Sequence, residues 1–246
     1  MNPQTVFKRY ELKYLLTPQQ KQKVLEAMSG HMQLDEYGRT IIRNIYYDTD
    51  NFRLIRASLE RPLYKEKLRV RSYDRVGPSD KVFIEIKKKY DGVVYKRRIH
   101  IPEEEAMDYL AGSRRPRKQN QITEEIDYFL SFYKELKPKV FLTYEREAYY
   151  STDPGEFRVT FDENILWRET GLSLQSDVYG MPILSPEQTL MELKTPGAIP
   201  LWMVNVLSAE GIRKTTFSKY GNAYRAICNR DKNILPVKEK TNEYNI

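Results

Sequence analysis

The sequence has little cysteine, little histidine and no long apolar run. Its single cysteine, Cys228, excludes an internal disulfide and a metal cage built from thiolates, which favours a reducing compartment. With only two histidines, His31 and His100, chemistry centred on histidine has little material. Met1 to Tyr10 lacks the apolar stretch of a signal peptide, and nowhere do about 18 apolar residues run together. We therefore expect a cytoplasmic protein that is not inserted into a membrane.

Charge is what the sequence has in abundance. Charged residues make up 30% of the 246 residues, and the net charge of +7 indicates an anionic partner. No stretch rich in Pro, Gly and Ser divides the chain, and its length suits one hydrophobic core. We expect a single domain over residues 1–230, followed by a disordered tail over residues 231–246, where Lys, Asn and Glu are frequent.

Hydrophobic periodicity predicts strands that alternate with helices. Strands are predicted over residues 7–16, 41–47, 65–73, 82–89, 93–101, 139–150, 156–162 with a continuation near Trp167, and 190–195. Helices are predicted from Thr17-Pro18 to Met28, from Asp48 to Leu59, from Pro102, over 122–136 up to Pro138, and over 201–210 and 218–229. Because full closure removes every sheet edge, the predicted fold class is α+β, a closed antiparallel β-barrel of about eight strands that forms a charged tunnel, with peripheral helices.

The strand faces opposite the apolar residues carry charge. Arg9, Glu11 and Lys13 share one side of the first strand, since successive side chains point to opposite faces. The same spacing aligns Arg69 with Arg71, Glu85 with Lys87, Tyr144 with Arg146, Arg158 with Asp162, and Glu192 with Lys194. A solvated outer face explains one such strand on its own. Six strands with the same pattern indicate a common charged interior.

The Asp91-Gly92 turn fixes the register of one hairpin. A two-residue loop places Lys87 opposite Lys96 and Glu85 opposite Arg98. Like charges directly opposite destabilise a hairpin by up to about 1 kcal/mol, so we expect an anion to compensate. Lysines that splay into water are the alternative for this hairpin alone.

Rows that mix basic and acidic residues suit a polyanion bridged by a metal. Basic groups bind the phosphates, and a carboxylate binds the divalent cation. Interleaved acidic residues would repel a nucleic-acid backbone, which disfavours that partner although the 19 tyrosines provide stacking surfaces. Glu11 and Glu85 are expected to orient basic residues.

Short motifs of this kind recur along most of the chain, from Phe7 to about Arg225. In order they are Arg9-Tyr10-Glu11-Leu12-Lys13-Tyr14, Tyr46-Tyr47-Asp48, Leu68-Arg69-Val70-Arg71-Ser72-Tyr73, Glu85-Ile86-Lys87, Tyr95-Lys96-Arg97-Arg98, Thr143-Tyr144-Glu145-Arg146, Arg158-Val159-Thr160-Phe161-Asp162, Glu192-Leu193-Lys194 and Phe217-Ser218-Lys219-Tyr220. Together they make the sequence resemble the VTC domain, the polyphosphate polymerase branch of the triphosphate tunnel metalloenzymes.

The resemblance implies a tunnel that binds ATP, transfers its terminal phosphoryl group onto a growing polyphosphate, and uses a divalent metal, Mn or Mg. It implies that the phosphates are held by Lys13, Arg69, Arg71, Lys87, Lys96, Arg146 and Arg158. It assigns the metal to Glu192 and a further phosphate contact to Lys219. The face pattern adds Arg9, Arg98 and Lys194 to the phosphate-binding set. Of these residues, Arg69, Arg71, Lys87 and Glu192 are expected to act in catalysis.

Two positions depart from the pattern of the relatives. The hydrolase and cyclase relatives open with Glu-x-Glu-x-Lys, whereas Arg9 stands at the first of these positions, which removes a metal ligand and favours the polymerase branch. Thr216 stands where the polymerases have a lysine, with Lys214 close by, which puts the exit contact in doubt. The alternatives are a metal-dependent triphosphatase of the same fold, or a non-catalytic module that binds polyphosphate or nucleic acid.

Overall fold

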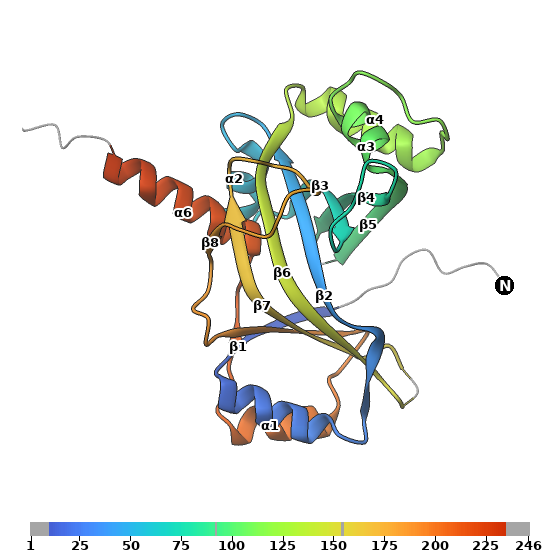
Figure 1. Ribbon diagram of the computed structural model, residues 1–246. Helices are drawn as coiled ribbons and strands as arrows, with labels where there is room; N and C mark the ends of the chain where they lie inside the picture. Colours follow the sequence, from blue (N-terminus) through green and yellow to red (C-terminus); the bar gives the residue numbers. More distant parts are fainter. Residues whose placement is uncertain (1–9, 92, 154, 235–246) are drawn as a thin grey trace, which may run out of the picture.

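The computed structural model describes residues 10–91, 93–153 and 155–234 and shows strands and helices interspersed along the chain (Figure 1). The strands are β1 (Tyr10–Leu16), β2 (Met32–Asp48), β3 (Tyr64–Tyr73), β4 (Lys81–Tyr90), β5 (Val93–Pro102), β6 (Lys137–Ser151), β7 (Arg158–Arg168), β8 (Met181–Pro182), β9 (Thr189–Thr195) and β10 (Lys214–Thr215). The helices are α1 (Pro18–Met28), α2 (Arg53–Leu59), α3 (Glu103–Leu110), α4 (Gln121–Tyr133), α5 (Leu201–Ala209) and α6 (Lys219–Ile234).

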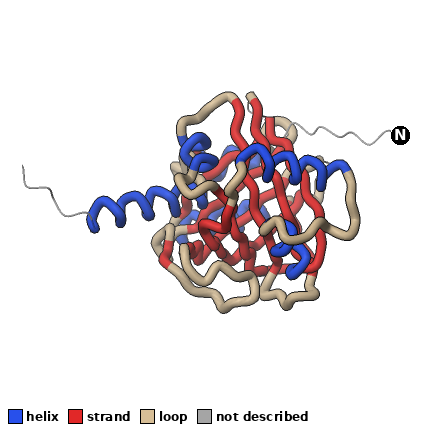
Figure 2. The backbone as a smooth tube through the Cα atoms, turned by 90° about the horizontal axis from the view of Figure 1, so that it is seen from above, coloured by secondary structure: helices blue, strands red, loops and turns tan. Residues whose placement is uncertain are grey.

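All these strands belong to one antiparallel sheet of ten strands, which is open. The order is β10-β1-β9-β7-β6-β2-β3-β4-β5, with β8 paired to β7, and among the described residues the end strands β10 and β5 do not pair. The predicted closed barrel of about eight strands is therefore wrong. The sheet nevertheless curls round on itself (Figure 2), because five strands lie between β1 and β4 in this order and yet Glu11 and Lys87 form a salt bridge of 3.4 Å.

Three apolar clusters hold the helices on the sheet. Helices α3 and α4 pack on the outer face of β3, β4 and β5, where Ile126 of α4 is buried in the first cluster. Helices α1 and α5 cover the outer face of β1, β9 and β7 through residues such as Val24 and Met203. Helix α6 packs on the inner face instead, where Tyr220 stacks on Tyr46 with ring centroids 4.5 Å apart. The inner face is thus apolar where α6 lies and charged in the remainder.

Local sequence signals predict some element boundaries and miss others. The Thr17 hydroxyl accepts a hydrogen bond from the Gln20 amide at 3.2 Å and caps α1 as expected. The helix predicted over 122–136 ends at Tyr133, because Lys134 adopts a left-handed φ of 50°. Pro138, expected to end that helix, lies inside β6.

Two further boundaries differ from the expectation. Strand β2 begins at Met32 and so is longer than predicted, and α6 continues through Ile234 into the segment predicted as a disordered tail. Residues 235–246 and Arg9 lie outside the described residues. In the part of the chain that the structure describes, no helix combines the length and the apolar character needed to cross a bilayer.

Candidate functional site

The strand register brings the charged faces together on the inner side of the curled sheet. Lys13 lies opposite Glu192, and Glu11 lies opposite Lys194, where β1 pairs with β9. The hairpin register predicted from the Asp91-Gly92 turn is confirmed, with Lys87 opposite Lys96 and Glu85 opposite Arg98. The other facing pairs are Arg146 with Asp162, Arg158 with Lys194, and Arg69 with Glu85. These residues come from seven strands and line one concave surface.

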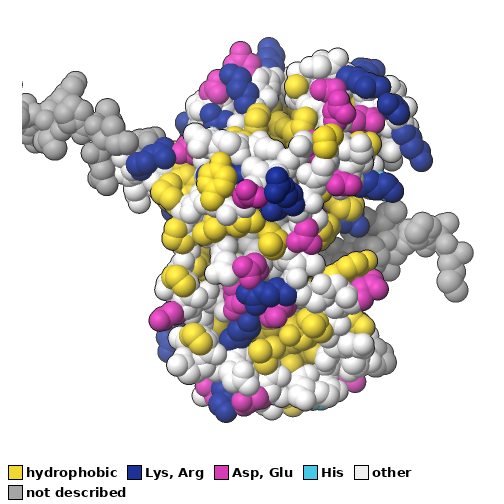
Figure 3. All heavy atoms as spheres, viewed as in Figure 1, with side chains coloured by type: hydrophobic (Ala, Val, Ile, Leu, Met, Phe, Trp, Pro, Cys, Tyr) yellow, Lys and Arg dark blue, Asp and Glu magenta, His cyan; other side chains and the backbone are white. Residues whose placement is uncertain are grey.

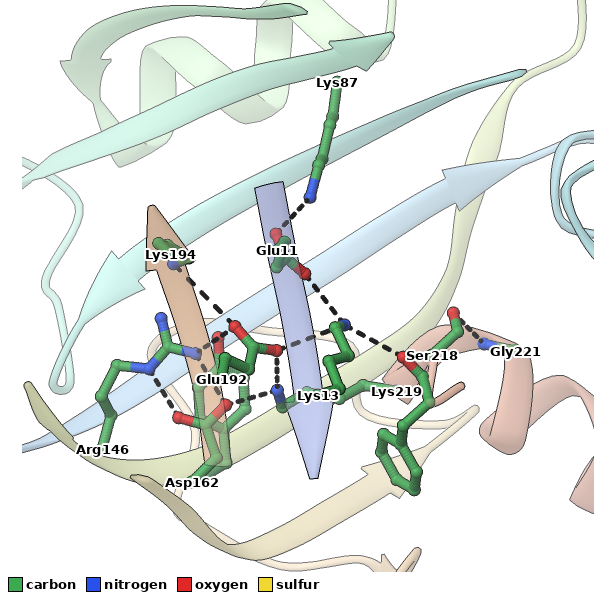
Figure 4. A network of polar contacts seen from close by, with 12 residues as sticks. Glu11, Lys13, Lys87, Arg146, Asp162, Glu192, Lys194, Ser218, Lys219 and Gly221 are labelled. Carbon is green, nitrogen blue, oxygen red and sulfur yellow. Dashed lines mark hydrogen bonds and ion pairs between the residues drawn. The ribbon is translucent and has the colours of Figure 1, made fainter. Parts of the chain in front are cut away.

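Glu192 occupies the middle of this surface (Figure 4). Its carboxylate lies 3.3 Å from the ammonium groups of both Lys13 and Lys219. The Arg146 guanidinium lies at 3.5 Å and the Lys194 ammonium at 3.9 Å. Burial by itself would raise the pKa of Glu192, but these four cations hold it well below its usual range. Glu192 is therefore ionised at neutral pH.

Asp162 is a second buried carboxylate beside Glu192, and sequence reasoning did not assign it to the site. Its side chain is fully buried, and it accepts two hydrogen bonds from the Arg146 guanidinium, at 2.5 and 2.6 Å. It also forms an ion pair with Lys219. Burial would raise the pKa of Asp162, but the charges of Arg146 and Lys219 lower it. The only sequence signal for this role was that Asp162 shares a strand face with Arg158.

Two more carboxylates of the inner surface each pair with two cations. Glu85 is 1% exposed and lies 2.7 Å from Arg69 and 2.5 Å from Lys96. Glu11 lies 3.0 Å from Lys13 and 3.4 Å from Lys87. Lys87 and Lys96, which face each other in the hairpin, are thus each compensated by a carboxylate of the protein. Glu11 and Glu85 lie where residues that orient these cations would lie.

Arg71 is held by neutral groups. It is buried, and its guanidinium donates to the side-chain oxygen of Asn44 at 2.9 Å and to the Tyr144 hydroxyl at 3.0 Å. The Tyr144 ring also lies under Arg146 and Lys219, at 5.1 and 4.5 Å from its centroid. Burial would raise the pKa of Tyr144, but Arg146, Arg71 and Lys219 lower it. Tyr144 therefore belongs to the charged surface.

The segment that leads into α6 lies across this surface. The Lys13 ammonium donates to the Phe217 carbonyl at 3.0 Å, and the Lys67 ammonium donates to the Ser218 hydroxyl at 3.3 Å. Lys219 reaches both Asp162 and Glu192. Three consecutive residues thus connect β1, β3, β7 and β9, as Figure 4 shows in part. Lys67 was not among the predicted site residues.

Four predicted phosphate-binding residues are less enclosed or not described. Lys96, Arg98 and Arg158 are exposed, and the Arg98 guanidinium lies 5.0 Å from the centroid of the Phe83 ring. Arg9 lies outside the described residues. Thr216, at the position that departs from the polymerase pattern, is exposed.

Charged residues also lie on the outer face, where they form ordinary surface ion pairs. Arg39 lies 2.6 Å from Glu145 and 2.9 Å from Glu163, which also pairs with Lys21 at 2.8 Å. The face with β2, β6 and β7 in front shows acidic and basic side chains interspersed (Figure 3). Alternation along the strand therefore separates Glu145 and Glu163, outside, from Arg146 and Asp162, inside.

The carboxylates of the inner surface suit a divalent metal only in part. Among the described residues, no three His, Cys, Asp or Glu side chains gather as a preformed metal site. Glu192 offers the hard oxygen donors that Mg and Mn prefer, and Asp162 lies close enough to share Lys219 and Arg146 with it. This donor set fits a metal that completes its coordination with phosphate oxygens and water.

Comparisons with known proteins identify the family and similar folds. The family model of the VTC domain matches residues 8–228. A candidate adenylyl cyclase from Hippeastrum, described as having a dominant triphosphatase activity, has a similar structure with a TM-score of 0.53 and 17% identity, over 93% of this chain and 98% of that one. A candidate adenylate cyclase from Bacillus halodurans has a TM-score of 0.52 and 14% identity, over 87% of this chain and 94% of that one. No curated protein matches in sequence. The chain belongs to the VTC domain family.

Proposed function

We propose that this protein is a polyphosphate polymerase, which transfers the terminal phosphoryl group of ATP onto a growing chain of inorganic polyphosphate. The observation that carries the proposal is the excess of positive charge enclosed by the curled sheet. We call this set the central cluster. Its eight cations are Lys13, Arg69, Arg71, Lys87, Lys96, Arg146, Lys194 and Lys219, and its four carboxylates are Glu11, Glu85, Asp162 and Glu192.

The surplus of about four positive charges suits a triphosphate. Seven of the cations lie on strands and Lys219 begins α6, and carboxylates, hydroxyls and an amide fix their side chains, so they are positioned before the substrate arrives. When phosphates bind, Lys13, Arg146 and Lys219 exchange a carboxylate oxygen for a phosphate oxygen. Phosphoryl transfer asks for positioning and for neutralisation of charge on phosphate oxygens, which these residues provide.

A divalent metal fits this scheme when it is held by Glu192 together with the phosphates. It would supply Lewis-acid polarisation of the phosphate oxygens. Around it, Arg69, Arg71 and Lys87 grip the triphosphate from β3 and β4. Arg146, Lys194 and Lys219 hold the opposite wall.

The choice of acceptor separates a polymerase from a hydrolase. Water must be positioned and deprotonated at the terminal phosphate, whereas a phosphate acceptor brings its own negative oxygens and needs cations to overcome its repulsion from ATP. The surplus of cations supports the phosphate acceptor. Arg9, where hydrolase relatives have an acidic residue, supports it too.

A metal-dependent triphosphatase is the second candidate, and one observation favours it. Three carboxylates, Glu11, Asp162 and Glu192, lie around Lys13 and Lys219, so the inner surface has more hard oxygen donors for a metal than Glu192 alone. The Hippeastrum protein of similar structure is described as a triphosphatase.

The test is to incubate the purified protein with ATP and Mn or Mg, and to measure ADP, free phosphate and long-chain polyphosphate separately. The proposal expects ADP and polyphosphate in step, with little free phosphate, and expects Glu192→Gln to abolish both. Free phosphate equal to ADP without polymer would establish the triphosphatase instead. Tight polyphosphate binding without turnover would leave a binding module.

A further inference from the structure

The central cluster continues into a row of lysines that no carboxylate of the described residues contacts. Where β3 pairs with β4, Lys65 lies opposite Lys89 and Lys67 lies opposite Lys87. Both are pairs of like charge on the same face as Arg69. We call Lys65, Lys67 and Lys89 the lysine ladder, and it adjoins the central cluster at Lys87. Such pairs destabilise a sheet unless an anion lies between them.

The ladder differs from the central cluster in having no carboxylate. Lys65 donates to the Ser58 carbonyl at 3.2 Å, and Lys67 donates to the Ser218 hydroxyl at 3.3 Å. Within the described part of the chain, no carboxylate lies within 4.0 Å of Lys65, Lys67 or Lys89. In contrast, at least one carboxylate lies within 4.0 Å of each of Lys13, Lys87, Lys96, Lys194 and Lys219.

Neighbouring cations lower the pKa values of two ladder lysines. Burial and, after it, the charges of Lys87, Lys13, Lys65 and Arg69 together lower the pKa of Lys67 to about 7. Burial and the charges of Lys89, Arg61 and Lys87 also lower the pKa of Lys65. These groups would regain full protonation when an anion binds beside them.

The ladder leads from the central cluster to the surface. Lys89 is exposed, and Lys65 lines a surface cavity of about 350 Å³ together with Arg53 and Lys88. Glu66 is the carboxylate of this cavity, and its two oxygens accept hydrogen bonds of 2.5 Å from the hydroxyls of Tyr64 and Tyr133. Lys88 pairs with Glu125 at 3.8 Å, so among the described residues Lys65 and Arg53 are the cations of this cavity that no carboxylate contacts.

We propose that the lysine ladder binds the phosphates of a polyphosphate chain beyond those held by the central cluster, so that the chain leaves along the inner face, past the end of the sheet where the start of β3 pairs with the end of β4. This inference rests on the proposed function and extends it to the path of the polymer. Successive ladder lysines start about 7 Å apart along β3, so an extended polyanion with a charge on every unit contacts them in turn. Lys65 and Lys89 lie two residues beyond Lys67 and Lys87, so a longer chain contacts them in addition to the groups that hold a triphosphate.

The test compares inorganic tripolyphosphate with a longer inorganic polyphosphate, by titration calorimetry with Mn present. The wild-type protein should bind the longer chain more tightly. Lys65→Met/Lys89→Met should lose most of that preference, about tenfold for each lysine. The matched control is Lys81→Met, at the opposite end of β4, which should keep the preference.

The double variant should also melt at the same temperature as the wild type or higher without ligand, because it removes a pair of like charges. Binding of the longer chain near pH 8 should take up protons, measured in buffers of different ionisation enthalpy, and Lys67→Met should reduce that uptake. An unchanged preference in the double variant, or an equal loss in Lys81→Met, would overturn the ladder assignment. Failure of the wild type to bind tripolyphosphate would instead overturn the proposed function.

Discussion

Asp162→Asn tests whether the enclosed cations depend on the protein's own carboxylates until phosphate arrives. The change removes the charge that faces Arg146 at 2.5 and 2.6 Å and that also pairs with Lys219, in a side chain with no exposure. Breaking a buried ion pair costs about 3–5 kcal/mol, and we take the lower value, about 3 kcal/mol, because Asn still accepts one hydrogen bond. For a chain of this size that loss lowers the melting temperature by roughly 6–12 °C.

The assay is thermal melting with and without tripolyphosphate. The ligand should stabilise Asp162→Asn more than the wild type, because Arg146 and Lys219 are then free to bind phosphate. Glu163→Gln is the matched control, since Glu163 is the next residue and points to the outer face, where it pairs with Lys21 and Arg39. That change should cost about 0–1 kcal/mol and leave the ligand response unaltered. Equal losses in the two variants, or equal ligand responses, would refute the reasoning.

Three further outcomes are expected. Lys87→Ala should weaken triphosphate binding about tenfold, whereas Lys88→Ala, on the opposite face of β4, should not. Equal affinities of Lys87→Ala and the wild type in a titration would contradict the face assignment. The metal should bind weakly alone and far better with a non-hydrolysable nucleotide. Glu192→Gln should lower turnover more than it lowers nucleotide affinity. Equal metal affinities with and without nucleotide would exclude a site that Glu192 shares with the phosphates. Because the pKa of Lys67 falls from 10.5 to about 7 on folding, the unfolded chain binds more protons between these pH values, so stability should rise with pH there. Urea unfolding should show that Lys67→Met loses this rise, and an identical pH profile in both proteins would count against the low pKa.

The inward set of residues was predictable because strand alternation is a local property. The spacing of Glu11 with Lys13, and of Glu192 with Lys194, places each pair on one face whatever the sheet order. The Asp91-Gly92 turn also fixed which residues meet across one hairpin, and the register of Lys87 with Lys96 is confirmed. These signals predicted a charged surface, but they did not predict which cation pairs with which carboxylate on it.

The partners of each charge depend on long-range pairing, which no local signal specifies. Arg146 meets Asp162 only because β6 pairs with β7 through a register shift between Thr143 and Glu145. In the same way, the Lys67 and Lys87 pair depends on the register of β3 and β4, whose connection contains no two-residue turn signal. Closure of the sheet failed as a prediction for a related reason. Whether a sheet closes depends on whether its first and last strands pair, which depends on the whole strand order. Here side-chain contacts such as Glu11 with Lys87 hold the curled sheet, and the end strands β10 and β5 do not pair among the described residues.

The most direct measurement of the central claim is whether a phosphate chain, and not water, accepts the phosphoryl group. The purified protein is incubated with ATP labelled on its terminal phosphate, with Mn, and with or without a short polyphosphate primer. ADP, labelled free phosphate and labelled polymer are then measured over time. The account predicts that the primer speeds ADP formation and that the label enters the polymer. ADP formation that ignores the primer, with all the label in free phosphate, would contradict it.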